Sequence, residues 1–137
     1  NAMILEEHEK EDAFAAAHAV LAASGTVTTE VALQGAPVVV GYKLGWITWA
    51  IARAILLKSK YTTLMNVAAN EEVAPEIIQT RFNAANLAAS AAQLLDDLDY
   101  RANQITAQNR ALDAMGRGAR PAAEIAADAV LAELAKS

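Results

Sequence analysis

Two short apolar runs, each followed by a helical pattern, constrain the fold of this chain more than any other feature. Residues 19–23 read Ala-Val-Leu-Ala-Ala, and residues 37–42 read Pro-Val-Val-Val-Gly-Tyr. Apolar runs of this length, without alternating polar residues, are typical of parallel strands that are buried on both faces. Between them, residues 26–34 carry apolar side chains at helical spacing and stop at Gly35, a residue suited to a helix C-terminus. The pattern therefore predicts a strand, a helix and a second strand.

The rest of the chain is predicted to contain one more strand and several helices. Residues 61–67 include β-branched side chains and are predicted as the third strand. Residues 70–75 are predicted as a loop and residues 76–79 as one short helical turn. Asn83 is well placed to cap a helix. Helices are predicted over residues 6–17, 46–57, 84–96, 99–115 and 121–135.

Strands that alternate with helices predict an α/β fold, with a small parallel sheet flanked by helices and a helical C-terminus. A complete doubly wound domain usually has more than three strands, so we expect this chain to be truncated on its N-terminal side. The first three amino acids, Asn1, Ala2 and Met3, resemble what remains after an expression tag is cleaved off. Residues 4–137 are predicted to form a single domain.

The composition argues against several classes of function. The chain has no cysteine, so it can form neither a disulfide framework nor a thiolate metal site. His8 and His18 are not expected to bind a metal, and no cofactor is expected. With 11 basic and 16 acidic residues, the net charge is −5. Because no basic face is evident to replace the counterions of duplex nucleic acid, we do not expect nucleic acid as a partner.

The stretch that carries chemistry lies between the first predicted strand and the helix that follows it. Open α/β sheets bind ligands at the carboxyl ends of their strands, and Gly25 would let a ligand approach the backbone there. The amides of the helical turn that starts at Thr26 suit a diphosphate. Glu30, about one turn further along, can accept hydrogen bonds from two neighbouring hydroxyls, such as those of a ribose.

A purely structural interpretation of the same stretch is also open. Ser24 or Thr26 could only cap the helix, and Glu30 could only complement the helix dipole. A capping box, however, would need serine or threonine at the position of Val27. Capping therefore does not explain Glu30.

The order Ser24-Gly25-Thr26, followed by Glu30, resembles the nucleotide-sugar site of two-domain, GT-B-type glycosyltransferases. A closer similarity, to lipid-A-disaccharide synthase, extends over nearly the whole chain. The similar stretches are residues 22–26, Glu30 and residues 35–43, 61–66, 72–79 and 126–131. The most specific of them is Glu-Val-Ala-Pro-Glu-Ile-Ile-Gln, over residues 72–79. The resemblance implies a partial Rossmann-like fold, the C-terminal half of a GT-B enzyme.

The family that the chain resembles transfers 2,3-diacylglucosamine from UDP to 2,3-diacylglucosamine 1-phosphate, with inversion, in lipid A biosynthesis. The resemblance implies that four residues touch UDP: Ser24, Gly25, Thr26 and Glu30. It implies that five others line the cleft near the donor: Tyr42, Asn66, Glu72, Glu76 and Gln79. No catalytic residue is assigned here, because the general base is expected in an N-terminal domain that the chain lacks. The fragment alone is therefore expected to be inactive.

The chain departs from the family pattern at two positions, and several alternatives stay open. Met65 stands where the family usually has proline, and Asn70 where it usually has glycine. Asn66 could instead cap a turn, Glu76 could complement a helix N-terminus, and Tyr42 could simply pack at the sheet edge. Two other functions stay open: a different UDP-sugar transferase or epimerase, which the block from Asn66 to Gln79 argues against, and a non-enzymatic, alanine-rich interaction domain.

Residues 38–57 are long enough to suggest a membrane span, but glycine, lysine and arginine residues interrupt them. The apolar side chains of the predicted helix over residues 46–57 recur at helical spacing and could simply pack in the core. Trp46 and Trp49, with basic residues nearby, also suit a membrane interface. We therefore expect a cytoplasmic protein in peripheral contact with the inner membrane. Because truncation leaves an open sheet edge, we also expect self-association or an exchange of C-terminal helices between chains.

Overall fold

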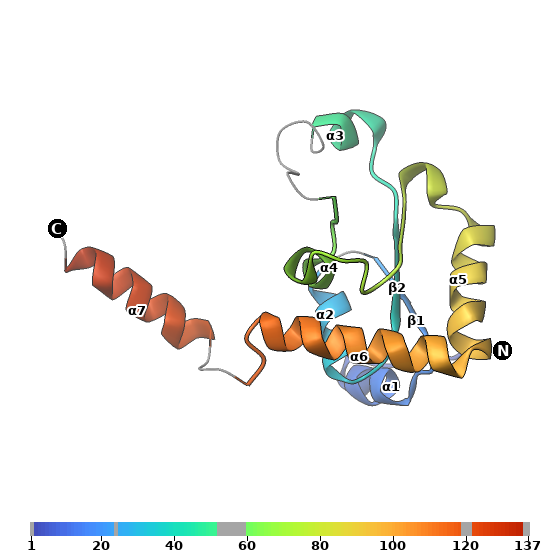
Figure 1. Ribbon diagram of the computed structural model, residues 1–137, viewed down its shortest axis with the longest axis horizontal. Coiled ribbons are helices and arrows are strands. Elements are labelled where there is room, and N and C mark those ends of the chain that lie inside the picture. The colour runs from blue at the N-terminus through green and yellow to red at the C-terminus, as the bar shows by residue number, and fades with distance from the viewer. Residues whose placement is uncertain (1, 24, 52–59, 119–121, 136–137) are drawn as a thin grey trace.

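The computed structural model describes residues 2–23, 25–51, 60–118 and 122–135, and Figure 1 shows how their helices and strands are arranged. The N-terminal part contains the short 3-10 helix η1 (Glu7–Glu9), α1 (Lys10–Ala16), β1 (Val20–Ala22), α2 (Thr26–Leu33) and β2 (Val38–Tyr42). The central part contains α3 (Trp46–Ile51), α4 (Leu64–Ala69), β3 (Glu76–Ile78) and the 3-10 helix η3 (Gln79–Arg81). The C-terminal part is helical, with α5 (Ala84–Asp96), α6 (Leu98–Ala114) and α7 (Ala122–Leu134).

The strands form one parallel sheet in the order β1-β2-β3. Val20 of β1 pairs with Val38 of β2, and Val40 of β2 pairs with Glu76 of β3. The predicted fold class is confirmed: a small parallel sheet flanked by helices, with a helical C-terminus, consistent with part of a Rossmann-like fold.

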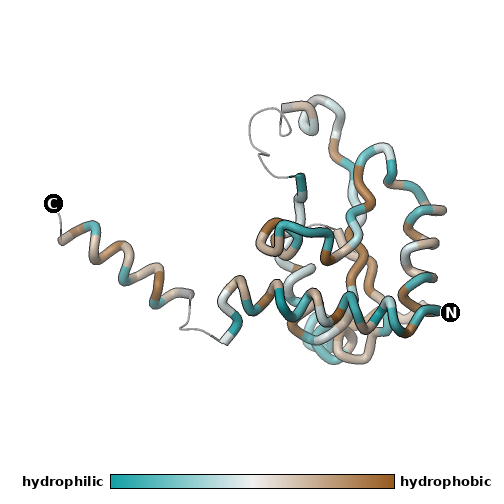
Figure 2. Tube along the Cα trace, viewed as in Figure 1, coloured by the Kyte–Doolittle hydropathy of each residue, from teal (hydrophilic) through white to brown (hydrophobic). Residues whose placement is uncertain are grey.

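Helices cover both faces of the sheet. On one face, a buried cluster joins β2 to α2, α4 and α6 through Val31, Val38, Val40, Met65 and Leu112. On the other face, Val39 of β2 packs with Ile77 of β3 and Leu94 of α5. In Figure 2, hydrophobic colour follows β1 and β2 through the middle of this body. The continuous apolar run of β2 is thus explained by burial on both faces.

Two glutamines of α6 fix the start of β2. Gln108 accepts a hydrogen bond from the Val38 amide at 3.2 Å and donates one to the Ala36 carbonyl oxygen at 2.9 Å. Gln104 donates to the Val38 carbonyl oxygen at 2.8 Å and to Oε1 of Gln108 at 3.0 Å. Both side chains are buried, so these bonds satisfy backbone groups that water does not reach.

The third strand is not where the sequence pattern predicts it. Residues 61–67 were expected as a strand, but α4 begins at Leu64, and Thr63 is its extended N-cap residue. The third strand is β3, Glu76–Ile78, where a helical turn was expected. The β-branched pair before α4 favours extended backbone only locally, whereas β3 is set by its pairing with β2. Such tertiary pairing overrides the propensity of a three-residue segment.

The predicted helices after the sheet are present, with small changes at their ends. Asn83 caps α5 as predicted, because its Oδ1 accepts the Asn86 amide at 2.9 Å. Asp97 caps α6 in the same way, through the Tyr100 amide at 2.8 Å. The helix predicted over residues 46–57 is described up to Ile51, and its remainder lies outside the described residues.

Helix α7 stands away from the body of the molecule in Figure 1. Four of its large apolar side chains are more than half exposed: Ile125, Val130, Leu131 and Leu134. Within the described ranges, no helix combines the length and apolar character needed to cross a bilayer.

Candidate functional site

The turns that follow the three strands meet at one edge of the sheet, because the strands are parallel. β1 ends at Ala22, β2 at Tyr42 and β3 at Ile78. α2 and η3 begin shortly after their strands, and α3 follows β2 at the same end of the molecule (Figure 1). Ligands of open α/β sheets bind at this edge.

The turn before α2 has a backbone conformation that glycine adopts more easily than other residues. Gly25 has a φ angle of 145°, which favours glycine, and a Cβ there would meet nothing within 4 Å. Its carbonyl oxygen accepts hydrogen bonds from the Thr28 amide at 3.3 Å and the Thr28 hydroxyl at 2.8 Å. Among the described side chains none caps α2, and Ser24 lies outside the described residues. The turn therefore presents its first amides, beginning at Thr26, without a described side-chain acceptor.

Glu30 lies on the side of α2 that faces α1. Its Oε2 is 3.0 Å from Nζ of Lys10, which is also 2.9 Å from Oε1 of Glu7. Hydrogen bonds with Glu7 and then Glu30 raise the pKa of Lys10 above its ordinary value. A cavity of about 340 Å³ adjoins this cluster and is lined by Lys10, Glu11, Phe14, Glu30, Leu33 and Gln34. The Glu30 side chain is 45% exposed, so its carboxylate keeps access to solvent beside the Lys10 ion pair.

Tyr42 is half-buried at the end of β2 and packs against the core. Next to it, Gly41 makes room for α5: a Cβ at Gly41 would lie 2.6 Å from Cδ2 of Leu87 and 3.2 Å from Cε2 of Phe82. A cavity of about 190 Å³ opens beside these residues and the end of β1, lined by Leu21, Ala22, Ala23, Gly41, Phe82 and Leu87. Close packing around Gly41 therefore shapes this part of the edge.

Asn66 and Glu76 lie together in a buried network. The Glu76 carboxylate accepts hydrogen bonds from the Thr62 amide and hydroxyl, the Thr63 amide and the Asn66 side chain, at 2.7–3.2 Å. Asn66 also exchanges two hydrogen bonds of 2.8 Å with the backbone of Ala74. Asn66 is fully buried and Glu76 is 7% exposed. Their polar atoms bind the chain's own backbone, and their role as donor ligands stays a prediction.

Glu72 and Gln79 lie at opposite ends of β3. Glu72 precedes the strand, is exposed, and accepts the Glu76 amide at 3.3 Å. Gln79 follows the strand and binds the backbone of Leu44: its Oε1 accepts the Leu44 amide at 2.8 Å, and its Nε2 donates to the Leu44 carbonyl oxygen at 3.4 Å. Gln79 therefore joins the turns after β2 and β3, whereas Glu72 is on the amino side of the sheet.

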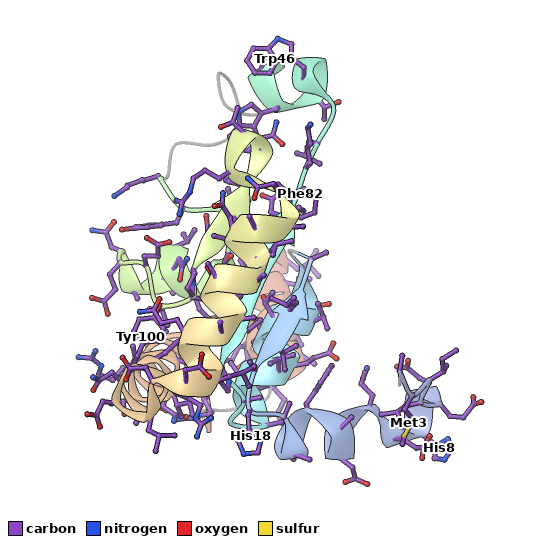
Figure 3. All side chains as sticks on the ribbon, turned by 90° about the vertical axis from the view of Figure 1, so that its right-hand side faces the viewer. Met3, His8, His18, Trp46, Phe82 and Tyr100 are labelled. Carbon is purple, nitrogen blue, oxygen red and sulfur yellow. The ribbon has the colours of Figure 1, made fainter. Side chains whose placement is uncertain are left out.

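The two histidines are far apart in the described structure. Figure 3 shows His8 near the N-terminal end and His18 close to the start of β1. Among the described residues, no group of three or more histidine or carboxylate side chains could hold a metal ion.

Comparison with known proteins decides the family. A family model described as lipid-A-disaccharide synthetase matches residues 1–130. The chain belongs to this family. A lipid-A-disaccharide synthase from Paramagnetospirillum magneticum is 42% identical over 130 residues, which are 94% of this chain and 33% of that protein. One from Bradyrhizobium diazoefficiens is 39% identical over 135 residues, 98% of this chain and 34% of that protein.

The predicted family is thus confirmed, and the chain spans about a third of the length of these curated relatives. The two departures from the lipid-A-disaccharide synthase pattern fit the structure. Asn70 has a φ angle of 53°, a left-handed conformation that glycine and asparagine adopt most easily. Met65 is the second residue of α4, where proline is tolerated because the amide has no partner within the helix.

The structure brings some of the predicted site residues together and separates others. Gly25 and Thr26 begin α2 at the carboxyl edge, and Tyr42 and Gln79 lie beside neighbouring strand ends. The contacts of Lys10 with Glu30 and of Gln79 with Leu44 were missed from the sequence. They join residues 20 and 35 positions apart, and no local pattern marks such pairs.

Proposed function

We propose that this chain is the UDP-sugar-binding part of a lipid-A-disaccharide synthase. In that role it would help transfer 2,3-diacylglucosamine from UDP to 2,3-diacylglucosamine 1-phosphate. The observation that carries the proposal is the turn at Gly25 and Thr26, at the carboxyl edge of a parallel sheet in a chain of this family. Its glycine conformation, and a helix start without a cap among the described side chains, suit a diphosphate.

The proposed site divides the nucleotide between the turn and α2. Ser24, Gly25 and Thr26 would contact the diphosphate, and Glu30 would accept the ribose hydroxyls. Glu30 already accepts a hydrogen bond from Lys10, but a carboxylate has room for several donors, so ribose can bind beside the ammonium group. Tyr42 would line the cleft from the end of β2. Gln79 would line it from the end of β3, whereas Glu72 lies on the amino side of the sheet, and Asn66 and Glu76 are buried in their own hydrogen-bond network.

In the proposed reaction, the acceptor hydroxyl attacks the anomeric carbon while UDP leaves, with inversion. Two groups are needed: a base for the hydroxyl proton and hydrogen-bond donors for the departing diphosphate. The turn before α2 would supply the donors. The base is expected outside these 137 residues, which span about a third of the relatives' length. We therefore propose that the chain alone binds UDP without catalysing transfer.

A titration with UDP, monitored by NMR, tests the proposed nucleotide site at Gly25, Thr26 and Glu30. Amide shifts at Gly25 and loss of affinity in Glu30→Gln are the expected results. An ionised carboxylate strengthens a hydrogen bond by about 1.5–3 kcal/mol, so the affinity should fall roughly ten- to a hundredfold. Glu11→Gln is the matched control, because Glu11 is an exposed carboxylate beside the same cavity. Unchanged spectra at millimolar UDP would favour the alanine-rich interaction domain.

Peripheral contact with the cytoplasmic face of the inner membrane is the second part of the proposal. Trp46 is 74% exposed, and Lys43 is exposed nearby in the sequence. Figure 3 shows Trp46 on α3, at the end of the molecule to which β2 leads. Tryptophan and lysine together suit an anionic interface. Vesicles with anionic lipid should float the full-length enzyme, and Trp46→Ser should reduce the bound fraction. Leu98→Ser, at an exposed leucine of α6, is the control.

Association between copies of the chain is the third part. The apolar side chains of α7 are exposed in this structure, so α7 has a face that another chain could cover. We propose that C-terminal helices associate or exchange between copies. Light scattering should report a species larger than one chain, and Leu131→Lys should shift it to the monomer. A wild-type monomer at all concentrations would contradict this part.

A further inference from the structure

The segment that leaves β2 is held to β3 by side chains at both of its described ends. Residues 43–51, here called the α3 arm, lead from β2 into α3, and residues 60–63 lead back into α4. Gln79 binds the arm at Leu44, and Glu76 binds the returning chain at Thr62 and Thr63.

The contact of Gln79 is reciprocal and well defined. Its amide group both accepts from the Leu44 amide and donates to the Leu44 carbonyl oxygen, at 2.8 and 3.4 Å. Gln79 itself has a φ angle of 53°, a left-handed conformation that is uncommon for residues with a Cβ. Such backbone persists where surrounding contacts hold it. In Gln79, the left-handed backbone and the side chain bonded to Leu44 thus belong to the same residue.

The contact of Glu76 is the stronger anchor. Its buried carboxylate accepts the backbone amides of both Thr62 and Thr63, at 3.0 and 2.7 Å, as well as the Thr62 hydroxyl at 2.9 Å. A buried carboxylate is stable when it accepts several hydrogen bonds, and these bonds tie it to the returning chain. β3 is itself fixed, because the Val40 amide donates to the Pro75 carbonyl oxygen at 2.9 Å and β3 pairs with β2.

We infer that Gln79 is a positioning residue for the α3 arm, while Glu76 holds the returning chain at Thr62 and Thr63. β3 thereby holds the arm at the carboxyl edge, so that exposed Trp46 keeps a fixed place relative to the turn at Gly25. The fixed place of Trp46 would join the nucleotide site to an acyl or membrane surface, and this role rests on the proposed function. The anchoring of the arm by Gln79 does not depend on the proposed function, and it is measured without nucleotide.

Tryptophan fluorescence tests the anchor directly. The sequence has two tryptophans, Trp46 and Trp49, and both lie in α3, so the whole tryptophan signal of the 137-residue chain comes from the arm. Gln79→Gly removes both hydrogen bonds to Leu44, but the left-handed backbone of this position can remain, because glycine adopts it freely. The amplitude of nanosecond depolarisation should rise roughly two- to threefold, the difference between a rigid and a flexible backbone.

Thr80→Ala is the matched control, because Thr80 is the exposed neighbour of Gln79 in η3. It should leave the depolarisation unchanged. Circular dichroism would verify that each variant is folded. A folded Gln79→Gly chain with wild-type depolarisation, or an equal rise in Thr80→Ala, would overturn the inference.

The same variants keep this inference apart from the proposed function. If Gln79 positions the arm, Gln79→Gly changes depolarisation in the absence of UDP, whether or not UDP binds. If Gln79 acts only as a donor ligand, the variant weakens UDP binding and leaves depolarisation unchanged, which would overturn the positioning role. Glu30→Gln, which tests the nucleotide site, should not alter the tryptophan signal.

Discussion

At the amino end of the sheet, Gln104 and Gln108 of α6 bind the backbone around Val38, whereas at the carboxyl end the chain leaves β1 through Gly25 and no described side chain caps α2. The first end has its backbone groups paired within the protein. The second has the start of α2, and a separate cavity opens there beside Ala22, Ala23 and Gly41. Buried amide side chains thus stabilise the fold at the amino end, while the turn at the carboxyl end, without a described side-chain cap on α2, is the part that we propose binds a ligand.

The largest loss of stability is expected when the hydrogen bonds of Gln108 at the amino end of the sheet are removed. Gln108→Leu leaves the Val38 amide and the Ala36 carbonyl oxygen buried without this partner, and it also removes the bond from Gln104. The free energy of unfolding should fall by about 3–5 kcal/mol, since each unpaired buried group costs about 1–3 kcal/mol. Urea unfolding measures the change. Gln93→Leu, at an exposed glutamine of α5, is the control and should change little.

A smaller loss is expected from crowding the carboxyl end. Gly41→Ala would place a Cβ 2.6 Å from Cδ2 of Leu87, so α5 must shift or Leu87 must change rotamer. Overpacking of this kind costs about 1–3 kcal/mol. Gly45→Ala, just after β2, is the matched control, because the nearest neighbour of its Cβ, Oγ1 of Thr48, would be 3.8 Å away. Equal stability of the two variants would mean that Gly41 is not a close-packing position.

The sequence predicted those elements at each end of the sheet whose residue pattern is local, and it missed those that depend on distant contacts. The strands β1 and β2 were predicted because each is a continuous apolar run, and the turn at Gly25 because glycine follows such a run. β3 was misplaced because three residues carry too weak a pattern, and its pairing with β2 is not visible locally. The extended residues before α4 were mistaken for a strand for the same reason.

The candidate site was predicted only in part. The place of Gly25 and Thr26 at the carboxyl edge follows from parallel strand order. The burial of Asn66 and Glu76 does not, because it depends on how the returning chain folds against β3. The same residue types suit a ligand site and an internal network, so residue type alone could not separate the two roles.

A third prediction concerns the loop that leads to β3 from the amino side. Asn70 adopts φ 53°, so Asn70→Ala should lower the free energy of unfolding by about 1 kcal/mol, the usual cost of a left-handed residue with a Cβ. Asn70→Gly should stay within about 0.5 kcal/mol of the wild type, because glycine adopts this conformation freely. Urea midpoints of the two variants compare them directly. A glycine variant less stable than the alanine variant would contradict the backbone explanation.

The smallest expected effect is a pH dependence at Tyr100, which lies beside Glu72 on the amino side of β3. Burial, and then the negative charge of Glu72, raise the pKa of Tyr100 above its ordinary value. The folded chain then holds this proton at a pH where the unfolded chain has lost it, so stability is complete below about pH 10 and falls as the pH rises further. Lys10, whose pKa is also raised, lowers stability in the same direction, because the unfolded chain releases this proton at a lower pH than the folded chain. Urea midpoints between about pH 8 and 11 should therefore fall less steeply in Tyr100→Phe than in the wild type, and parallel profiles would show that Tyr100 is not desolvated in the folded chain.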